Sequence, residues 1–372
     1  MATMRVQKAT HEQLRTHNRN LLLRAIYQGL ADNRAALAQV SGLTKPTVSN
    51  LVAELIEDGF VNEIGHGPSS ESGGKRPRLV GFRADAHHVI GISVDHDGIH
   101  GVLTDLAGAV TARHRAALAP DDPIASLTGV IDGLRAQMDA PLLCIGIGVP
   151  GEVDGAAGVV RRTDAFGWRD LALTRPLAER YEVPVHLGHG TELCALAQYA
   201  FGADRDASPQ RLVTLQIGRG IELGVTLEGG TVHYGGDLSS LFGHHPGPSG
   251  PERLEDLLRV GDTQDAGPPD YLEWRYAASQ GDAAANERIQ ALAIRLAPVV
   301  AWTAALLRPN QLALAGPIVD LGDGFLEDVV RHAESWLPGG PLDDVQFTLA
   351  YANRLGALGA VALAVQRELA IL

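Results

Sequence analysis

The chain has 372 residues, of which 45% are hydrophobic and 20% are charged, with two cysteines and a formal net charge of −13. This composition excludes collagen-like and disordered proteins, and two cysteines are too few for a disulfide framework or a thiolate zinc site. At about 100–200 residues per domain, the length predicts two or three folded units.

The sequence predicts neither secretion nor membrane insertion. The first residues, MATMRVQKATHEQ, lack the apolar stretch of a signal peptide. The most apolar window, residues 289–307, is interrupted by Arg295 and Pro298 and therefore predicts a buried core helix. Cys144 and Cys194 have no framework to join, which favours a reducing compartment. We expect a cytoplasmic protein without a membrane span.

The charge is unevenly distributed along the chain. Residues 1–83 carry 11 Lys and Arg against 7 Asp and Glu, a net charge of +4, which leaves −17 for residues 84–372. All three lysines of the protein lie in the first segment. Because binding to a nucleic acid requires a basic surface, this asymmetry predicts a basic nucleic-acid-binding domain joined to an acidic body.

The first 83 residues have the pattern of a winged helix-turn-helix domain. Apolar spacing predicts helices over residues 11–28, 34–40 and 44–59, with Asn33 and Thr44 as N-caps. Short strands are expected over residues 60–64 and 79–82, on either side of a Gly- and Ser-rich loop. Helix, turn, helix and two-stranded ribbon is typical of this DNA-binding fold. The alternative is a small basic helical dimerisation module.

Two groups of residues are candidates for DNA contacts. The N-terminal part of the third helix faces base edges in such domains, where Asn50 suits adenine and Lys45 suits guanine or phosphate. The basic loop favours entry into an A·T-rich minor groove, with phosphate contact alone as the alternative. The candidates are Thr44, Lys45, Thr47, Ser49 and Asn50 on the helix, and Lys75, Arg76 and Arg78 in the wing.

From residue 84 onward the pattern becomes α/β. Strands are expected over residues 89–94, 99–104, 110–115 and 142–148, with a helix over residues 123–138. A similar meander follows over residues 212–217, 222–227 and 231–234, with a later strand over residues 312–315. Two such halves predict a two-lobed domain, with lobes at 84–190 and 191–372 and a ligand cleft between them.

Several strings in this part match a known family in order and spacing. They are GIGVPG at 146–151, VD at 153–154, GVV at 158–160, FGWRDL at 166–171, PV at 184–185, GH at 243–244, LE at 254–255 and LGA at 355–357. The chain resembles the sugar-kinase-like domain of the ROK family (repressors, open reading frames and kinases), and its winged helix resembles that of the family's regulators. The resemblance implies an actin-like ATPase fold of the ribonuclease H-like type.

The residues that the resemblance assigns to kinase chemistry are mostly changed here. The first phosphate turn corresponds to residues 93–97, which now carry carboxylates, and the second reads Gly218-Arg219-Gly220. The Asn-Asp pair corresponds to Gly188-His189, and the Glu before Gly-His is Leu241. His189 keeps a possible general base, but Gly188 lacks a side chain to hold a sugar hydroxyl. We therefore expect no catalytic residues and no kinase activity.

The resemblance also leaves a modified ligand cleft. Its candidate residues are Gly151, His189, Glu192, His244 and Glu255. The loop that carries three zinc-binding cysteines in the family is short here and has none, so we expect no metal and no cofactor. A site built from His186, His189, His244 and His245 is the alternative to scattered loop histidines.

The sequence thus predicts a DNA-binding transcriptional regulator, expected to act as a repressor on double-stranded operator DNA. A homodimer or homotetramer would place two reading helices on two half-sites. A carbohydrate-like or altered small molecule in the cleft would change operator affinity. Two alternatives stay open: a carbohydrate kinase with an attached DNA-binding module, and a regulator controlled by a non-sugar ligand or a protein partner.

Overall fold

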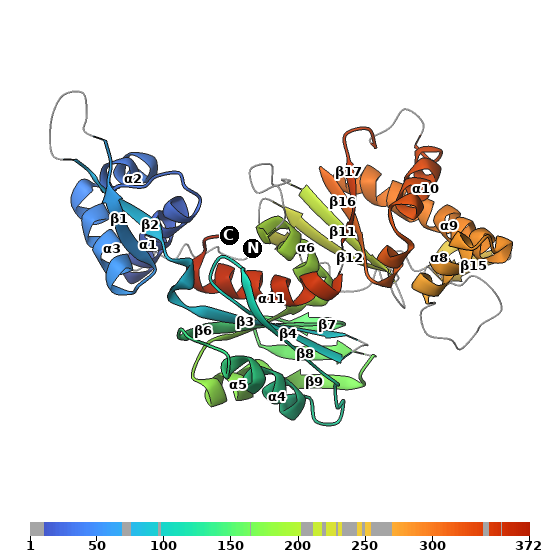
Figure 1. The fold of residues 1–372 in the computed structure, drawn as a ribbon, viewed down its shortest axis with the longest axis horizontal. Coiled ribbons are helices and arrows are strands. Elements are labelled where there is room, and N and C mark those ends of the chain that lie inside the picture. The colour runs from blue at the N-terminus through green and yellow to red at the C-terminus, as the bar shows by residue number, and fades with distance from the viewer. Residues whose placement is uncertain are drawn as a thin grey trace, which may run out of the picture.

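The structure is a computed structural model of the 372-residue chain. It describes residues 11–68, 76–95, 98–163, 165–201, 211–217, 221–227, 230–232, 244–247, 250–253, 270–337, 342–350 and 352–372. A small helical unit lies at one end, a first α/β lobe in the middle and a second α/β lobe at the other end (Figure 1). The prediction of a mixed α/β body is confirmed, and the N-terminal unit has the helices and the two-stranded ribbon that the sequence predicts.

The N-terminal unit contains three helices and a two-stranded antiparallel ribbon within residues 11–82. Its elements are α1 (His11–Tyr27), α2 (Arg34–Ser41), α3 (Lys45–Glu57), β1 (Val61–His66) and β2 (Arg78–Phe82). The Asn33 side chain caps α2 by accepting from the N–H groups of Ala35 and Ala36 at 3.1 and 3.0 Å. Gly42, at φ +69°, ends α2 in the left-handed conformation that glycine adopts readily. Local signals therefore fix the turn before α3.

The first lobe is built on a five-stranded mixed sheet with strand order β10-β6-β3-β4-β5. Its strands are β3 (His88–Asp95), β4 (Gly98–Thr104), β5 (Val110–Ala116), β6 (Leu142–Val149) and β10 (Val185–His189). The strands β3, β4 and β5 are antiparallel neighbours, whereas β6 runs parallel to β3 and β10. The helices α4 (Pro123–Arg135) and α5 (Thr174–Tyr181) cover one face of this sheet (Figure 1).

A three-stranded antiparallel sheet extends the first lobe and was not predicted. It contains β7 (Glu152–Asp154), β8 (Val159–Thr163) and β9 (Trp168–Ala172). Trp168 is buried at 6% exposure, and its indole N–H donates to the Pro120 carbonyl oxygen at 2.9 Å. Val160 of β8 is fully buried in the same core cluster, and β7 contacts β10, so several contacts hold these short strands to the lobe.

The second lobe contains another five-stranded sheet, with order β13-β12-β11-β16-β17. The strands are β11 (Arg211–Ile217), β12 (Ile221–Leu227), β13 (Gly230–Val232), β16 (Gln311–Ala315) and β17 (Gln346–Ala350). The helices α8 (Tyr271–Ser279), α9 (Ala283–Leu307) and α10 (Asp323–Glu334) belong to this lobe, as do the short 3-10 helix η4 (Pro317–Leu321) and the ribbon β14 (His244–Gly247) with β15 (Gly250–Arg253). A further 3-10 turn, η1 (Ala84–Ala86), joins the N-terminal unit to β3.

Within the part of the chain that the structure describes, one helix, α9, is long and apolar enough to cross a membrane. Half of its most apolar 18-residue window is buried inside the protein. Leu292, Leu296 and Val300 have at most 1% exposure and share a core cluster with the second-lobe sheet. Core helices pass the same length and composition test, and the contacts of α9 are those of the core helix that the sequence predicts.

Two further helices lie between the two sheets. The helix α6 (Gly190–Phe201) contacts β11 and β12 of the second lobe, and α11 (Ala352–Leu369) contacts both α6 and the strands β3, β6 and β10 (Figure 1). The sequence predicts lobes at 84–190 and 191–372, so α11 was expected in the second lobe. In the structure the helix lies on the first-lobe sheet. Glycines allow this close approach, because a Cβ at Gly146 would meet the backbone of Ala360.

Candidate functional sites: a DNA-reading helix and an interlobe cleft

The exposed face of α3 carries most of the predicted DNA-contact residues. Val48, Leu51, Val52 and Leu55 are buried at 0–4% exposure and hold the opposite face in the core. Lys45, Ser49 and Asn50 are exposed near the helix N-terminus. A helix with this division of faces can present its polar side to the major groove without loss of core contacts.

Thr44 and Thr47 have a structural role at the same helix end. The Thr44 hydroxyl accepts from the Thr47 N–H at 3.4 Å, and the two hydroxyl groups lie 2.8 Å apart. Pro46 occupies the first turn, where its missing N–H has no partner to lose. Thr44 therefore caps α3, and its hydroxyl is engaged with Thr47 at the start of the helix.

One of the predicted DNA-contact residues of the wing, Arg78, is held in an ion pair. Arg78 lies on β2 and donates to the Glu63 carboxylate on β1 at 2.9 Å, and Arg34 approaches the same carboxylate at 3.5 Å. Arg76 is exposed just before β2, and Lys75 lies outside the described residues. Because Glu63 neutralises part of the charge of Arg78, the ion pair ties this arginine to the stem of the wing.

Three of the residues predicted to line an interlobe cleft lie where strands of the first lobe end. Gly151 follows β6 with φ +96°, and a Cβ there would meet the Arg162 carbonyl oxygen, so the turn requires glycine. His189 ends β10 with 7% exposure, and its Nε2 is buried without a hydrogen-bond partner among the residues described. Glu192 follows in α6 at 4% exposure. Three of the five predicted cleft residues therefore lie around β6, β10 and α6.

Gly188 corrects one step of the sequence argument. A Cβ built there would lie 3.0 Å from Leu193 and 3.0 Å from Leu363, so a side chain at this position would point toward α6 and α11. The absence of a side chain at Gly188 therefore removes no group from the cleft. Gly190, by contrast, has no atom closer than 3.7 Å to its built Cβ, so position 190 has room for a side chain.

A partly buried polar cluster that the sequence did not reveal joins α6 to strands β11 and β12 of the second-lobe sheet. The Thr191 hydroxyl on α6 donates to the Glu222 carboxylate on β12 and lies 3.4 Å from the Gln216 amide oxygen on β11. Cys194 lies one turn further along α6, where burial, with smaller contributions from Glu222 and Asp95, raises the pKa of its thiol to about 12. The thiol stays protonated at neutral pH and is not a nucleophile.

The remaining candidates of the cleft fall in less fully described segments. Glu255 lies outside the described residues, and His244 is placed only as the first residue of β14. Within the described part of the chain, His, Cys, Asp and Glu residues form no group of three that could hold a metal ion. His186 is paired with Glu368 of α11 at 2.8 Å, which separates it from the proposed histidine group.

Asp95, in the first phosphate turn, is engaged in a local contact. Its carboxylate lies 3.1 Å from Nε2 of His100 on the neighbouring strand β4. A carboxylate at this turn repels phosphate oxygens rather than holding them. Residues 96, 97 and 218–220, which complete the two predicted phosphate turns, lie outside the described residues.

Comparison with known proteins places part of this chain next to a known family. Residues 89–253 match the model of the ROK family. A xylose repressor from Bacillus subtilis (strain 168) is 34% identical over 233 residues, which are 61% of this chain and 59% of that protein. The chain thus matches about three fifths of the length of this relative.

Solved structures share the fold over three quarters or more of the chain. A ROK family transcriptional regulator, described as a homologue of the E. coli MLC protein, has a TM-score of 0.74 at 19% identity and covers 94% of this chain and 96% of its own. A ROK family glucokinase from Streptomyces griseus, solved with glucose and AMPPNP, has a TM-score of 0.60 at 21% identity and covers 75% of this chain and 99% of its own. Residues 89–253 are therefore similar to the ROK family domain, and the solved structures share the fold.

Proposed function

We propose that this protein is a cytoplasmic DNA-binding transcriptional regulator that represses its target by binding operator DNA through α3 and the wing. The observation that carries the proposal is the exposed polar face of α3, with Lys45, Ser49 and Asn50 outside a fully buried apolar stripe. The basic charge of residues 1–83 supports it, because an acidic body at −17 would otherwise repel DNA. The name of the Bacillus subtilis relative supports repression.

Two copies of the chain are needed to bind a palindromic operator. One winged helix covers a single half-site, and a symmetric dimer or tetramer would present two α3 helices to successive major grooves. The ROK-like body supplies the contacts between copies in this proposal.

The cleft would control DNA binding through α11. This helix contacts α6, which carries Glu192 and Thr191, and its C-terminal continuation reaches the winged helix. Ile371 and Leu372, at 0% and 8% exposure, join the same core cluster as Leu22 and Leu23 of α1. An effector that moves α6 would therefore also move α11, which supports the winged helix. The expected coupling between effector binding and DNA binding is about 1–3 kcal/mol.

The effector of this proposal is a small molecule of the carbohydrate class. The name of the xylose repressor points to a pentose, and Gly188 no longer argues against sugars because it faces α11. Thermal unfolding with xylose, hexoses and sugar phosphates tests this point. A ligand that raises the Tm of the wild type but not of a Glu192→Gln variant identifies the cleft, and stabilisation of both variants equally contradicts it.

The kinase alternative rests on the shared fold of the Streptomyces griseus glucokinase. We propose that turnover is absent, because the end of β10 carries His189 with a buried ring and the first phosphate turn carries Asp95 paired with His100. ATP consumption measured with a panel of pentoses and hexoses decides between the two. Sugar-dependent consumption at rates typical of kinases would overturn the non-enzymatic proposal.

The experiment that tests DNA binding is the sequencing of genomic fragments retained by the full chain. We expect enrichment of one palindromic motif, and we expect a Lys45→Ala and Asn50→Ala double variant to lose that enrichment. Arg175→Ala provides the matched control, because Arg175 is an exposed arginine of α5 with an 82% exposed side chain and lies in the body. Recovery of fragments without a shared motif would contradict sequence-specific binding.

A further inference from the structure

The first-lobe sheet ends in a strand whose outer edge is open. β5 is the last strand in the order β10-β6-β3-β4-β5, and within the described part of the chain it pairs with β4 alone. In an antiparallel pair, alternate residues turn their backbone N–H and C=O groups away from the neighbouring strand. The outer edge of β5 therefore presents backbone donors and acceptors to a further strand.

The two edges of this sheet differ in how they are covered. At the opposite edge, β7 contacts β10, and a Cβ built at Gly155 would lie 2.7 Å from the Leu187 carbonyl oxygen. The three-stranded sheet therefore shields β10. Among the described elements, the main contacts of β5 are with β4 and with α4, which packs on one face of the sheet and leaves the edge open.

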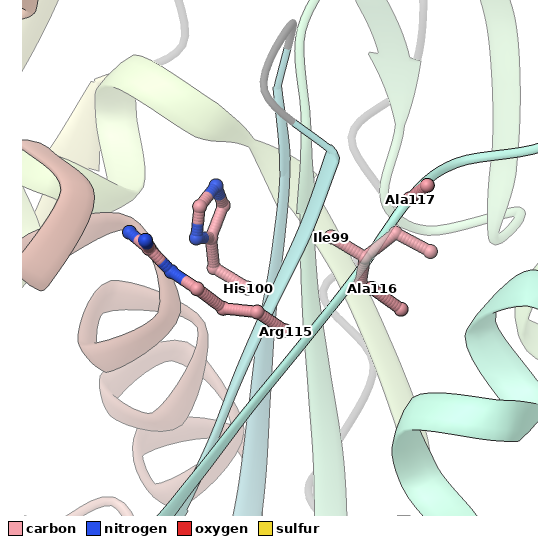
Figure 2. Close-up of a pocket in the computed structure, with 5 residues that line it drawn as sticks. All are labelled: Ile99, His100, Arg115, Ala116 and Ala117. Carbon is pink, nitrogen blue, oxygen red and sulfur yellow. The ribbon is translucent and has the colours of Figure 1, made fainter.

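Side chains alternate along β5 between two different surfaces. Ala112 and Ala116 are half-buried and pack against the core of the first lobe. Thr111, Arg113 and Arg115 are exposed on the other face. In Figure 2 the side chains of Arg115 and Ala116 extend to opposite sides of the strand. A strand added at this edge would continue an apolar surface on one face and a charged surface on the other.

The charged face of this edge is positive, although the body that carries it is acidic. Residues 110–116 contain two arginines and no Asp or Glu, whereas residues 84–372 together carry −17. Arg113 and Arg115 have no ion pair among the residues that the structure describes. Their guanidinium groups are available to carboxylates of an added strand.

The carboxylate of Asp95 lies away from this edge. It contacts Nε2 of His100 on β4 at 3.1 Å, and the strand register places His100 between β3 and Arg115. Because β4 separates β3 from β5, Asp95 is on the far side of β4 from the open edge. An added strand would therefore meet the charges of Arg113 and Arg115 first.

The same two arginines disfavour a second copy of the chain at this edge. Antiparallel pairing of β5 with β5 of another copy over the whole strand would place Arg113 opposite Arg113. Like charges directly opposite one another destabilise a cross-strand pair, whereas opposite charges stabilise it. The edge is therefore suited to an acidic strand and not to itself.

We propose that the outer edge of β5 binds an extended peptide of a partner protein in which acidic residues alternate with apolar ones. The peptide adds one strand to the five-stranded sheet through backbone hydrogen bonds. Its carboxylates lie beside Arg113 and Arg115, and its apolar side chains continue the surface formed by Ala112 and Ala116. The site is separate from α3 and from the cleft at His189, and it does not depend on the proposed DNA binding.

Fluorescence anisotropy with labelled peptides and the full chain tests the site. The probe is a blocked octapeptide of alternating Val and Glu. One control peptide has the same composition with all Val residues before all Glu residues, and another carries N-methyl groups throughout the alternating backbone. We expect saturable binding of the alternating peptide and at least fivefold weaker binding of both controls. Absence of saturable binding, or equal binding of all three peptides, would overturn the proposal.

Matched variants test the two arginines. Arg113→Gln and Arg115→Gln together should weaken binding of the alternating peptide at least tenfold, and both side chains are exposed, so the fold should be kept. Arg175→Gln is the control, because Arg175 lies on α5 of the same lobe with an 82% exposed side chain. We expect it to keep the wild-type affinity. Wild-type affinity in the double variant, or an equal loss in the control, would overturn the assignment to β5.

Hydrogen exchange of the β5 amides reports directly on the backbone contact. The N–H groups of residues 110–116 that point away from β4 should exchange more slowly when the alternating peptide is bound. The N–H groups of β10, at the covered edge, should exchange as they do without peptide. Unchanged exchange along β5 at saturating peptide would overturn strand addition.

Discussion

The winged helix and the body place their polar side chains in opposite ways. On α3 the polar residues Lys45, Ser49 and Asn50 are exposed, and the apolar ones are buried. Around the cleft the polar residues themselves are buried, as His189 and Glu192 show at 7% and 4% exposure. Surface polar groups contribute little to folding, whereas buried ones are part of the core. Substitutions on the exposed face of α3 should therefore alter the affinity for DNA. Substitutions around His189 and under α11 should alter the free energy of unfolding.

The largest expected effect is on DNA binding by α3. A Lys45→Ala and Asn50→Ala double variant should lose about 2–6 kcal/mol of operator affinity, because each base contact contributes about 1–3 kcal/mol. Its free energy of unfolding should stay within about 0.5 kcal/mol of the wild type, since both side chains are exposed. Fluorescence anisotropy and urea unfolding measure the two quantities. Loss of stability in parallel with affinity would remove the contrast between the two regions.

The next largest effect is on stability where α11 meets α6. A Cβ at Gly359 would meet the backbone carbonyl group of Leu193, which cannot move aside as a flexible side chain could. Gly359→Ala should therefore lower the free energy of unfolding by about 1–3 kcal/mol. Urea unfolding followed by circular dichroism measures this change.

Gly129 offers the matched control for the glycine substitution. It lies on the exposed side of α4 with nothing within 4 Å of its built Cβ. Gly129→Ala should raise the free energy of unfolding by about 0.5–1 kcal/mol, because alanine favours helix more than glycine does. If both variants changed stability by the same amount in the same direction, close packing of α11 would not be the reason.

A smaller effect is expected in the wing. Arg76→Ala should reduce the slope of log affinity against log salt by about 1, which corresponds to the loss of one phosphate contact. Arg78→Ala should change the slope less, because Glu63 already pairs with that arginine at 2.9 Å. Anisotropy titrations at several salt concentrations measure both slopes. A larger slope change for Arg78 than for Arg76 would show that the ion pair opens on DNA.

The smallest expected effect is a pH dependence at the junction of the two regions. Burial, together with the charge of Arg83, lowers the pKa of His87 below its usual 6.5, and its ring stacks on Phe60 at 5.1 Å. The folded state therefore favours the neutral ring, and its stability decreases as the pH falls from about 6.5 toward the lower folded pKa. Thermal unfolding between pH 7.5 and 5.5 should show a smaller decrease for His87→Asn than for the wild type. An equal decrease in both would assign the effect to other groups.

The parts of the molecule that follow local rules could be predicted from the sequence. Asn33 and Thr44 mark the starts of α2 and α3, and short apolar runs mark the buried strands β3, β4 and β6. These features depend on neighbours within a few residues, so the chain order contains them. The same rules gave the exposed face of α3.

Other features depend on contacts between distant residues and could not be predicted in this way. Thr191 and Glu222 are 31 positions apart and meet only because α6 lies against β12. Gly188 was expected to face the cleft, but the direction of its side chain follows from the position of α11, more than 150 residues later. The ion pair of Arg78 with Glu63 likewise could not be predicted, because it depends on the pairing of β1 with β2.

The most direct test of the account is a hydroxyl-radical footprint of the full chain on its selected operator. The account predicts two protected half-sites whose centres are one helical turn of about 10–10.5 base pairs, or an integer multiple of it, apart. The Lys45→Ala and Asn50→Ala double variant should leave both half-sites unprotected at the same protein concentration. Protection by the variant equal to that of the wild type, or a single unphased protected patch, would contradict DNA reading by two α3 helices.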